Sequence, residues 1–193
     1  MQQFTYVGYA SEHQMLLSPA YCPPESFDYA GGLIGALSVS FPIIMTGIAY
    51  GPVNICVVHH RSRPEANTSG WEDVAEISLL PVTDPITPGS QAENEPPQEV
   101  RLDFLGPGWY RARVHARNRD LKQDLGVEEP VEDYLIEVWP APPTQAITLK
   151  VTSDIGKILQ TPREHVLRDD PDTLPVPKPA ADPGPASAGR LEH

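Results

Sequence analysis

Cysteine is scarce in this chain of 193 residues, which contains only Cys22 and Cys56. Neither residue belongs to a Cys-x-x-Cys motif or to a Cys/His spacing that is typical of zinc sites. A chain of this length can bury a sizeable core without a covalent bridge. We therefore expect two reduced, partly buried thiols, although the sequence leaves a disulfide between them open.

Basic residues are also few, because 14 Lys and Arg stand against 26 Asp and Glu, giving a formal net charge of −12. Phosphate backbones and anionic lipids repel such a chain unless it segregates a basic face. Nucleic acid and membrane surfaces are therefore poor partners. The N-terminus, Met1-Gln2-Gln3-Phe4, lacks the basic and apolar regions of a secretory signal, so we expect a cytoplasmic location.

Charged residues are absent from 31–58, a stretch long enough to span a bilayer as a helix. Pro42, Gly51-Pro52 and Asn54 interrupt this stretch, and its β-branched residues cluster in runs of strand length. The pattern therefore favours three buried strands over one broken span. We place these strands at 33–41, 43–48 and 53–59, with turns at Pro42 and at 50–52.

Long helical patterns are missing as well, whereas the chain has 23 Pro and 14 Gly. Apolar and polar residues alternate in several short segments, as in half-buried strands. Besides the three strands above, the clearest segments lie at 4–9, 71–82, 100–105, 109–119, 131–139 and 147–152. We expect an all-β fold of about eight short strands, arranged as an antiparallel, jelly-roll-like β-sandwich.

Apolar periodicity fades from about residue 154, although 155–167 retains one marginal helical stretch. Beyond Arg168 the chain is rich in Pro, Ala and Asp, and cannot bury enough apolar surface to offset its ordering entropy. We therefore expect a sandwich domain at 1–153 and a largely disordered Pro-rich tail at 154–190. The last three residues, 191–193, resemble the remnant of an affinity tag.

One row of basic side chains stands out in this acidic chain. Alternation within 109–119 places the row on one face of a strand and apolar residues on the other. The row consists of Arg111, Arg113, His115, Arg117 and Arg119. A strand with this pattern has one face in the core, so the basic row lies on the opposite face.

Three interpretations of the basic row remain open. If 131–139 pairs antiparallel with the row's strand, Asp133 and Glu137 face it, and a hairpin partner at 100–105 supplies Asp103. Cross-strand ion pairs of this kind contribute roughly 0.2 to 1 kcal/mol each and need no ligand. The row is otherwise a binding face for an acidic partner surface, or a site for a small anion.

The acidic side of the predicted strand at 71–82 is expected to face water.

Motifs for nucleophilic, metal or phosphate chemistry are missing. There is no Gly-x-Ser-x-Gly turn and no His-Glu-x-x-His element, and Gly106-Pro107-Gly108 has the pattern of a hairpin turn. His59 and His60 are adjacent, so on a strand they point to opposite faces and cannot share a metal ion without a bend. We therefore predict no catalytic residue, no metal and no cofactor.

A second hypothesis places a small-ligand or enzymatic site near the hairpin and loop of 115–132. Several side chains suited to acid–base chemistry or ligand binding occur close together in this part of the sequence. They are His115, Arg117, Glu128, Glu129 and Glu132. Such a site requires that these side chains converge in space.

Two segments, GWYRARVHAR at 108–117 and VEDYLIEVWP at 131–140, resemble a hairpin of a group of small uncharacterised bacterial proteins. The order of features is also similar to that of the competence protein J family, whose role is nuclease inhibition. That order runs from FTYVGY through GLIGALSVSF and NICVVHH to RLDFLGPGWYRARVHA and EDYLIEVWP. The resemblance implies a non-catalytic β-sandwich that binds another protein, and no individual inhibitor residue carries over.

An acidic surface suits a basic nuclease as the partner. From the charge, the missing catalytic motifs and the resemblance, we expect a protein-binding or regulatory module, such as an inhibitor of a bacterial nuclease or toxin. The identity of the partner and the oligomeric state do not follow from the sequence.

Overall fold

The structure, a computed structural model, describes residues 1–17, 20–21, 30–36, 42–81, 88–89 and 100–160. Within these residues the chain is mostly β. Its strands are β1 (Gln2–Ser11), β2 (Gln14–Leu16), β3 (Ala20–Tyr21), β4 (Ile34–Ala36), β5 (Pro42–Met45), β6 (Tyr50–His59), β7 (Asp73–Pro81), β8 (Tyr110–Arg117), β9 (Asp133–Pro140) and β10 (Ile147–Val151). A short helix, α1 (Asp154–Leu159), follows the last strand.

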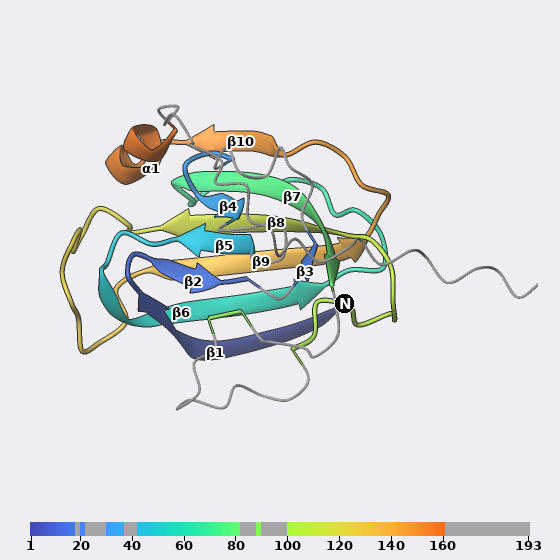
Figure 1. Cartoon of the computed structure of the whole chain (residues 1–193), viewed down its shortest axis with the longest axis horizontal. Coiled ribbons are helices and arrows are strands. Elements are labelled where there is room, and N and C mark those ends of the chain that lie inside the picture. The colour runs from blue at the N-terminus through green and yellow to red at the C-terminus, as the bar shows by residue number, and fades with distance from the viewer. Residues whose placement is uncertain (18–19, 22–29, 37–41, 82–87, 90–99, 161–193) are drawn as a thin grey trace, which may run out of the picture.

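The strands form one mixed sheet that curls into a half-barrel (Figure 1). The strand order is β10-β7-β8-β9-β6-β1-β2-β5-β4, and β3 pairs with β7 outside this path. Neighbouring strands pair antiparallel, with the exception of the parallel pair β6 and β9. The expected sandwich of two facing sheets is therefore not confirmed. Alternation shows that one face of a strand is covered, but a second sheet and the curl of the same sheet cover it equally well.

The core lies on the concave, inner face of the curled sheet. Val57 on β6, Ile136 on β9 and Val114 on β8 lie side by side in register and are fully buried. Leu33 and Ile34, at the β4 end of the sheet, belong to the same apolar cluster, and β4 contacts β7. Full burial of each such side chain contributes roughly 1.5 to 3 kcal/mol. The shared core thus holds the sheet in its curl.

Three strands do occur in the uncharged stretch, but their boundaries differ from the prediction. Pro42 begins β5 instead of forming a turn, which a strand's first residue permits because its N–H need not join the ladder. Tyr50 and Gly51 begin β6, and the turn lies at 46–49. Gly51 has a φ of 138° and lies against the backbone of Val127, where a side chain has no room. No helix in the described part of the chain is long and apolar enough to cross a membrane.

The predicted strand at 100–105 is wrong. Residues 102–105 form turns, and the neighbours of β8 are β7 and β9. Val100 and Leu102 are buried in the core cluster, so their alternation reflects a loop packed on the sheet. Asp103 pairs with Arg101, with Nη2 2.8 Å from Oδ2, and does not reach the basic row.

The first residues of the predicted tail form α1, which overlaps the start of the marginal helical stretch expected at 155–167. The hydroxyl oxygen of Ser153 accepts a hydrogen bond from the N–H of Gly156, which is a typical N-cap arrangement. The carboxylate of Asp120 accepts hydrogen bonds from the first two N–H groups of the helix, at 2.8 and 3.1 Å. The rest of the predicted tail and the expected tag remnant, 161–193, lie outside the described residues.

Candidate functional site

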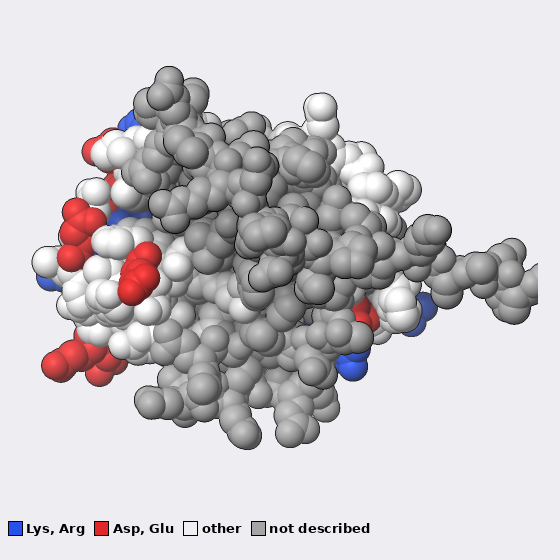
Figure 2. Space-filling model, in the orientation of Figure 1, with Lys and Arg blue, Asp and Glu red and all other residues white. Residues whose placement is uncertain are grey.

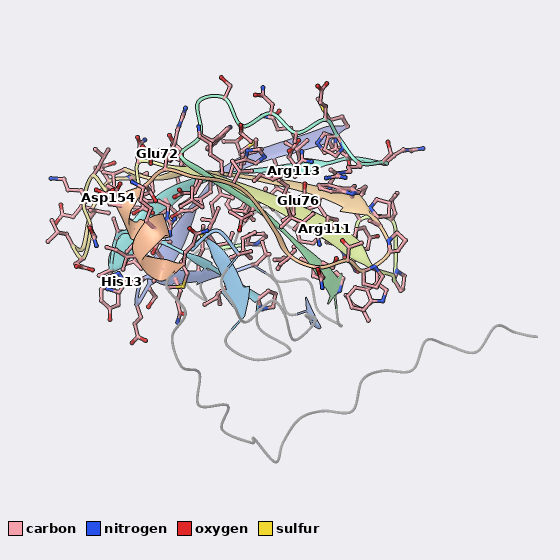
Figure 3. The ribbon with its side chains drawn as sticks, turned by 90° about the horizontal axis from the view of Figure 1, so that it is seen from above. His13, Glu72, Glu76, Arg111, Arg113 and Asp154 are labelled. Carbon is pink, nitrogen blue, oxygen red and sulfur yellow. The ribbon has the colours of Figure 1, made fainter. Side chains whose placement is uncertain are left out.

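The outer face of β7, β8 and β9 carries a polar network in place of an apolar surface (Figure 3). The polar network is defined here as Glu76, Arg111, Arg113, His115 and Glu137. Arg111, Arg113 and His115 occupy alternate positions of β8, as the sequence predicts. Glu76 lies opposite Arg113 on β7, and Glu137 lies opposite Arg113 on β9. Arg113 therefore sits between two acids on neighbouring strands.

Glu76 binds two arginines of the row. Its Oε1 accepts a hydrogen bond from Arg113 Nε at 2.8 Å, and its Oε2 accepts one from Arg111 Nε at 3.2 Å. The exposed Arg63 adds a longer contact of 3.5 Å. Glu76 is 1% exposed, so the expectation that the acidic side of this strand faces water is wrong at this position. The alternation within β7 predicts that Glu76 lies on the face opposite the apolar residues, but nothing in the sequence indicated that β7 is the neighbour of β8.

Glu137 holds the other side of the polar network. Its Oε2 accepts a hydrogen bond from Arg113 Nη1 at 2.9 Å and lies 3.0 Å from His115 Nε2. Its Oε1 lies 3.1 Å from His60 Nε2. The predicted antiparallel pairing, which places Asp133 and Glu137 opposite the row, is thus confirmed. Within it Arg113 pairs with Glu137, and Arg117 pairs with Asp133, with Nε 2.8 Å from Oδ2.

Both network acids carry charge at neutral pH. Burial alone raises the pKa of the Glu76 carboxyl, but the hydrogen bonds from Arg113 and Arg111 outweigh it and hold the pKa below its usual value. Glu137 follows the same pattern, because its bonds with His115 and Arg113 more than offset the burial, so its pKa is also lowered. The negative charges of the two acids therefore balance the two buried guanidinium groups.

Two loops cover the polar network from outside. The guanidinium of Arg113 donates to the backbone carbonyls of Pro64 and Glu65, and that of Arg111 donates to those of Thr144 and Gln145. Trp139 lies 5.1 Å from the Arg113 guanidinium and shields it further. Arg111 is 3% exposed and Arg113 is fully buried. These side chains bind carbonyls of their own chain and are not on the surface.

Arg119 does not belong to the row, and its predicted place there is wrong. β8 ends at Arg117, and Asn118 has a φ of 70°, which breaks the strand alternation. The Arg119 side chain lies in the interior, where Nη1 is 2.7 Å from Asp73 Oδ2 and Nη2 donates to the Gly32 carbonyl. Arg119 thus connects the first residue of β7 to the chain before β4.

The acids of the predicted 115–132 site do not meet the histidine and arginine of that site. Glu132 is buried and accepts hydrogen bonds from the N–H groups of Gly47 and Ile48 and from the Tyr134 hydroxyl. Burial raises its pKa, although these hydrogen bonds oppose the shift. Glu128 and Glu129 are exposed on the loop. His115 instead points to the outer face.

The remaining histidines and thiols form no obvious chemical centre in the part of the chain that the structure describes. His59 and His60 point to opposite faces of the sheet, as the sequence predicts: His59 stacks on Phe104, with ring centroids 4.1 Å apart, and His60 lies beside Glu137. No group of three potential metal ligands occurs among the described residues. Cys56 carries a free thiol, and Cys22 lies outside the described residues.

We expect His59 to make stability depend on pH below neutrality. The residue is 3% exposed, and burial lowers its pKa from the usual 6.5. The unfolded chain therefore binds a proton more readily than the folded one, so stability is full above about pH 6.5 and falls as the pH drops below it. Urea unfolding of the wild type and of His59→Phe at pH 7.5 and pH 5.5 checks this. The wild type should lose more stability than the variant, and equal losses would contradict the assignment.

No protein-family model matches the chain, and no curated protein sequence matches it. Among solved structures, the chain is similar to a protein described as "Crocagin biosynthetic gene J", with a TM-score of 0.43 and 11% sequence identity. The alignment covers 74% of this chain and 100% of that chain. A likeness at this level says nothing about what this protein binds. The resemblance to the competence protein J family stays a prediction.

Proposed function

We propose that this protein is a non-catalytic binding module for a basic partner protein. The observation that supports it is the distribution of charge. Among the described residues, the buried charged side chains are three acids and three arginines: Asp73, Glu76, Glu132, Arg111, Arg113 and Arg119. These groups balance one another, so the net charge of −12 is carried by the rest of the chain. Of the basic residues that suggested an anion site, four are buried inside the fold, and the exposed Arg117 pairs with Asp133.

An acidic chain favours a cationic partner over an anionic one. Complementary charge steers association and raises the on-rate, and the effect weakens with salt. Nucleases expose basic surfaces because their substrates are polyanions, so an inhibited bacterial nuclease or toxin is the specific form of this proposal. A cytoplasmic location belongs to the same proposal. The small-ligand or enzyme hypothesis gains no support, since the described side chains that it needs lie apart.

The test is nuclease activity in a lysate of the source cells, measured on RNA and DNA with and without the purified protein. We expect one activity to fall at about 50 mM salt and to recover at about 500 mM, since the attraction is screened. The inhibited enzyme should be retained on the immobilised protein, and its purified form should reproduce the inhibition. A folded acidic protein of equal charge serves as the control. The nuclease proposal fails if no activity changes, or if the control acts equally.

A further inference from the structure

One end of the molecule exposes large apolar side chains in a group. Eight such side chains are exposed in the described part of the chain, and four of them lie at the end that carries the loop 118–130 and α1 (Figure 1). They are Leu121 at 64%, Ile158 at 55%, Leu125 at 53% and Tyr50 at 48%. We call this surface the loop end. Single exposed apolar residues are ordinary, whereas a group of them marks an interaction surface.

Hydrogen bonds hold the loop end in a defined shape. The N–H of Ala49 donates to the Leu125 carbonyl at 2.9 Å, and the N–H of Val127 donates to the Tyr50 carbonyl at 2.9 Å. The N–H of Asp124 donates to the Gly47 carbonyl at 3.0 Å. On the other side of the loop, Asp120 caps α1. Leu121 and Leu125 are therefore presented on a backbone that is already ordered, which lowers the entropic cost of binding.

Acidic side chains surround these apolar residues. Figure 2 shows Asp and Glu gathered at the same end of the molecule. The exposed acids are Glu12, Asp120, Asp124, Glu128, Glu129 and Asp154, against Lys122, Lys157 and Arg117. Lys157 is moreover paired with Asp154, at 2.9 Å. The loop end thus has apolar residues within a negative rim, which is the general layout of a protein interface.

We propose that the loop end is the surface on which the basic partner docks, an inference that rests on the proposed function. The two leucines and Tyr50 enter an apolar depression of the partner, and the acids around them meet its lysines and arginines. A second copy of this chain fits less well, because two negative rims would face each other. Figure 3 shows Asp154 and His13 at this end, away from Glu76, Arg111 and Arg113, so the docking surface is separate from the polar network.

Matched variants test the surface. One variant carries Leu121→Ser with Leu125→Ser, and a second carries Asp124→Asn, Glu128→Gln and Glu129→Gln. Leu105→Ser is the control for the first, because Leu105 has the same 53% exposure as Leu125. Glu65→Gln is the control for the second. Leu105 lies away from the loop end, because it precedes β8 and the loop follows β8, about 25 Å further along the strand. Glu65 belongs to the loop that covers the polar network, where its carbonyl accepts a hydrogen bond from Arg113. Each leucine is also replaced singly, and circular dichroism confirms folding.

The probe is the purified basic nuclease that the wild type inhibits, with binding measured by calorimetry at several salt concentrations. We expect the leucine variant to bind at least tenfold more weakly, and the charge variant to bind more weakly with a smaller salt dependence, while both controls match the wild type. Loop-end variants that bind like the wild type would overturn the surface and leave the proposed function standing. If the wild type self-associates and only the leucine variant loses this self-association, the surface binds a second copy of the chain instead. A wild type that binds no nuclease would overturn the proposed function itself.

Discussion

Replacing Arg119 by methionine should destabilise the protein by about 3 to 5 kcal/mol. Arg119 and Asp73 are both fully buried, and their ion pair has Nη1 2.7 Å from Oδ2. The Asp73 carboxylate also accepts hydrogen bonds from the N–H groups of Thr152 and Ser153. Methionine fills much of the space but leaves the carboxylate buried without a positive charge. Urea unfolding at pH 7 measures the loss.

A double variant separates the lost ion pair from lost packing. Asp73→Asn removes the charge that Arg119→Met strands, so the double variant should be less destabilised than the sum of the two single variants. Arg119→Lys keeps the charge and should cost less than methionine. A loss below about 1 kcal/mol for Arg119→Met would mean that the pair behaves like an exposed one.

Arg113→Met should also cost about 3 to 5 kcal/mol, whereas Arg117→Met should cost at most about 1 kcal/mol. The two arginines lie on the same face of β8, four residues apart, and each pairs with an acid on β9. They differ in burial, because Arg113 is fully buried and the Arg117 side chain is 47% exposed. The alternation of the sequence alone predicts a loss of about 1 kcal/mol for either arginine. The larger loss expected for Arg113 comes from the loops that cover it. Chemical unfolding of both variants gives the comparison.

Double-mutant cycles show which acid Arg113 depends on. Cycles of Arg113→Met with Glu137→Gln and with Glu76→Gln should each give a coupling free energy above about 0.5 kcal/mol, because both acids contact the guanidinium directly. The cycle of Arg113→Met with Asp133→Asn is the control and should give a value near zero. A coupling free energy of zero with both Glu76 and Glu137 would contradict the conclusion that Arg113 is a buried charge paired with these two acids.

The strands could be predicted where a short segment had a clear period of two. β7, β8 and β10 fall within predicted segments, and β9 extends only one residue beyond its segment, because one face of each is apolar. The architecture could not be predicted, since alternation carries no information about the neighbour of a strand. The turn pattern at 106–108 suggested a hairpin between 100–105 and β8, and this wrong pairing hid the true neighbour, β7.

The candidate site was predictable in part. That Asp133 and Glu137 face the basic row followed from two alternating strands placed antiparallel. The burial of Arg113 did not follow, because it depends on backbone carbonyls of the polar loop at 61–70, which has no apolar pattern. Arg119 was misplaced because the left-handed φ of Asn118 ends the alternation, and a lone asparagine within a basic run gives little warning of it.

The parallel pair β6 and β9 also bears on how the chain folds. Along the strand order it joins two groups, the strands up to residue 59 on one side and those from residue 73 on the other, with the exception of β3, which pairs with β7. Two of the pairings connect segments that are far apart in sequence: Asn54 of β6 and Asp133 of β9 are 79 positions apart, and Val151 of β10 and Asp73 of β7 are 78 positions apart. Closing a loop of this length costs about 2 kcal/mol more than closing a ten-residue loop. We therefore expect the pairings of β6 with β9 and of β7 with β10 to form after the shorter-range ones, and such non-local pairing slows folding.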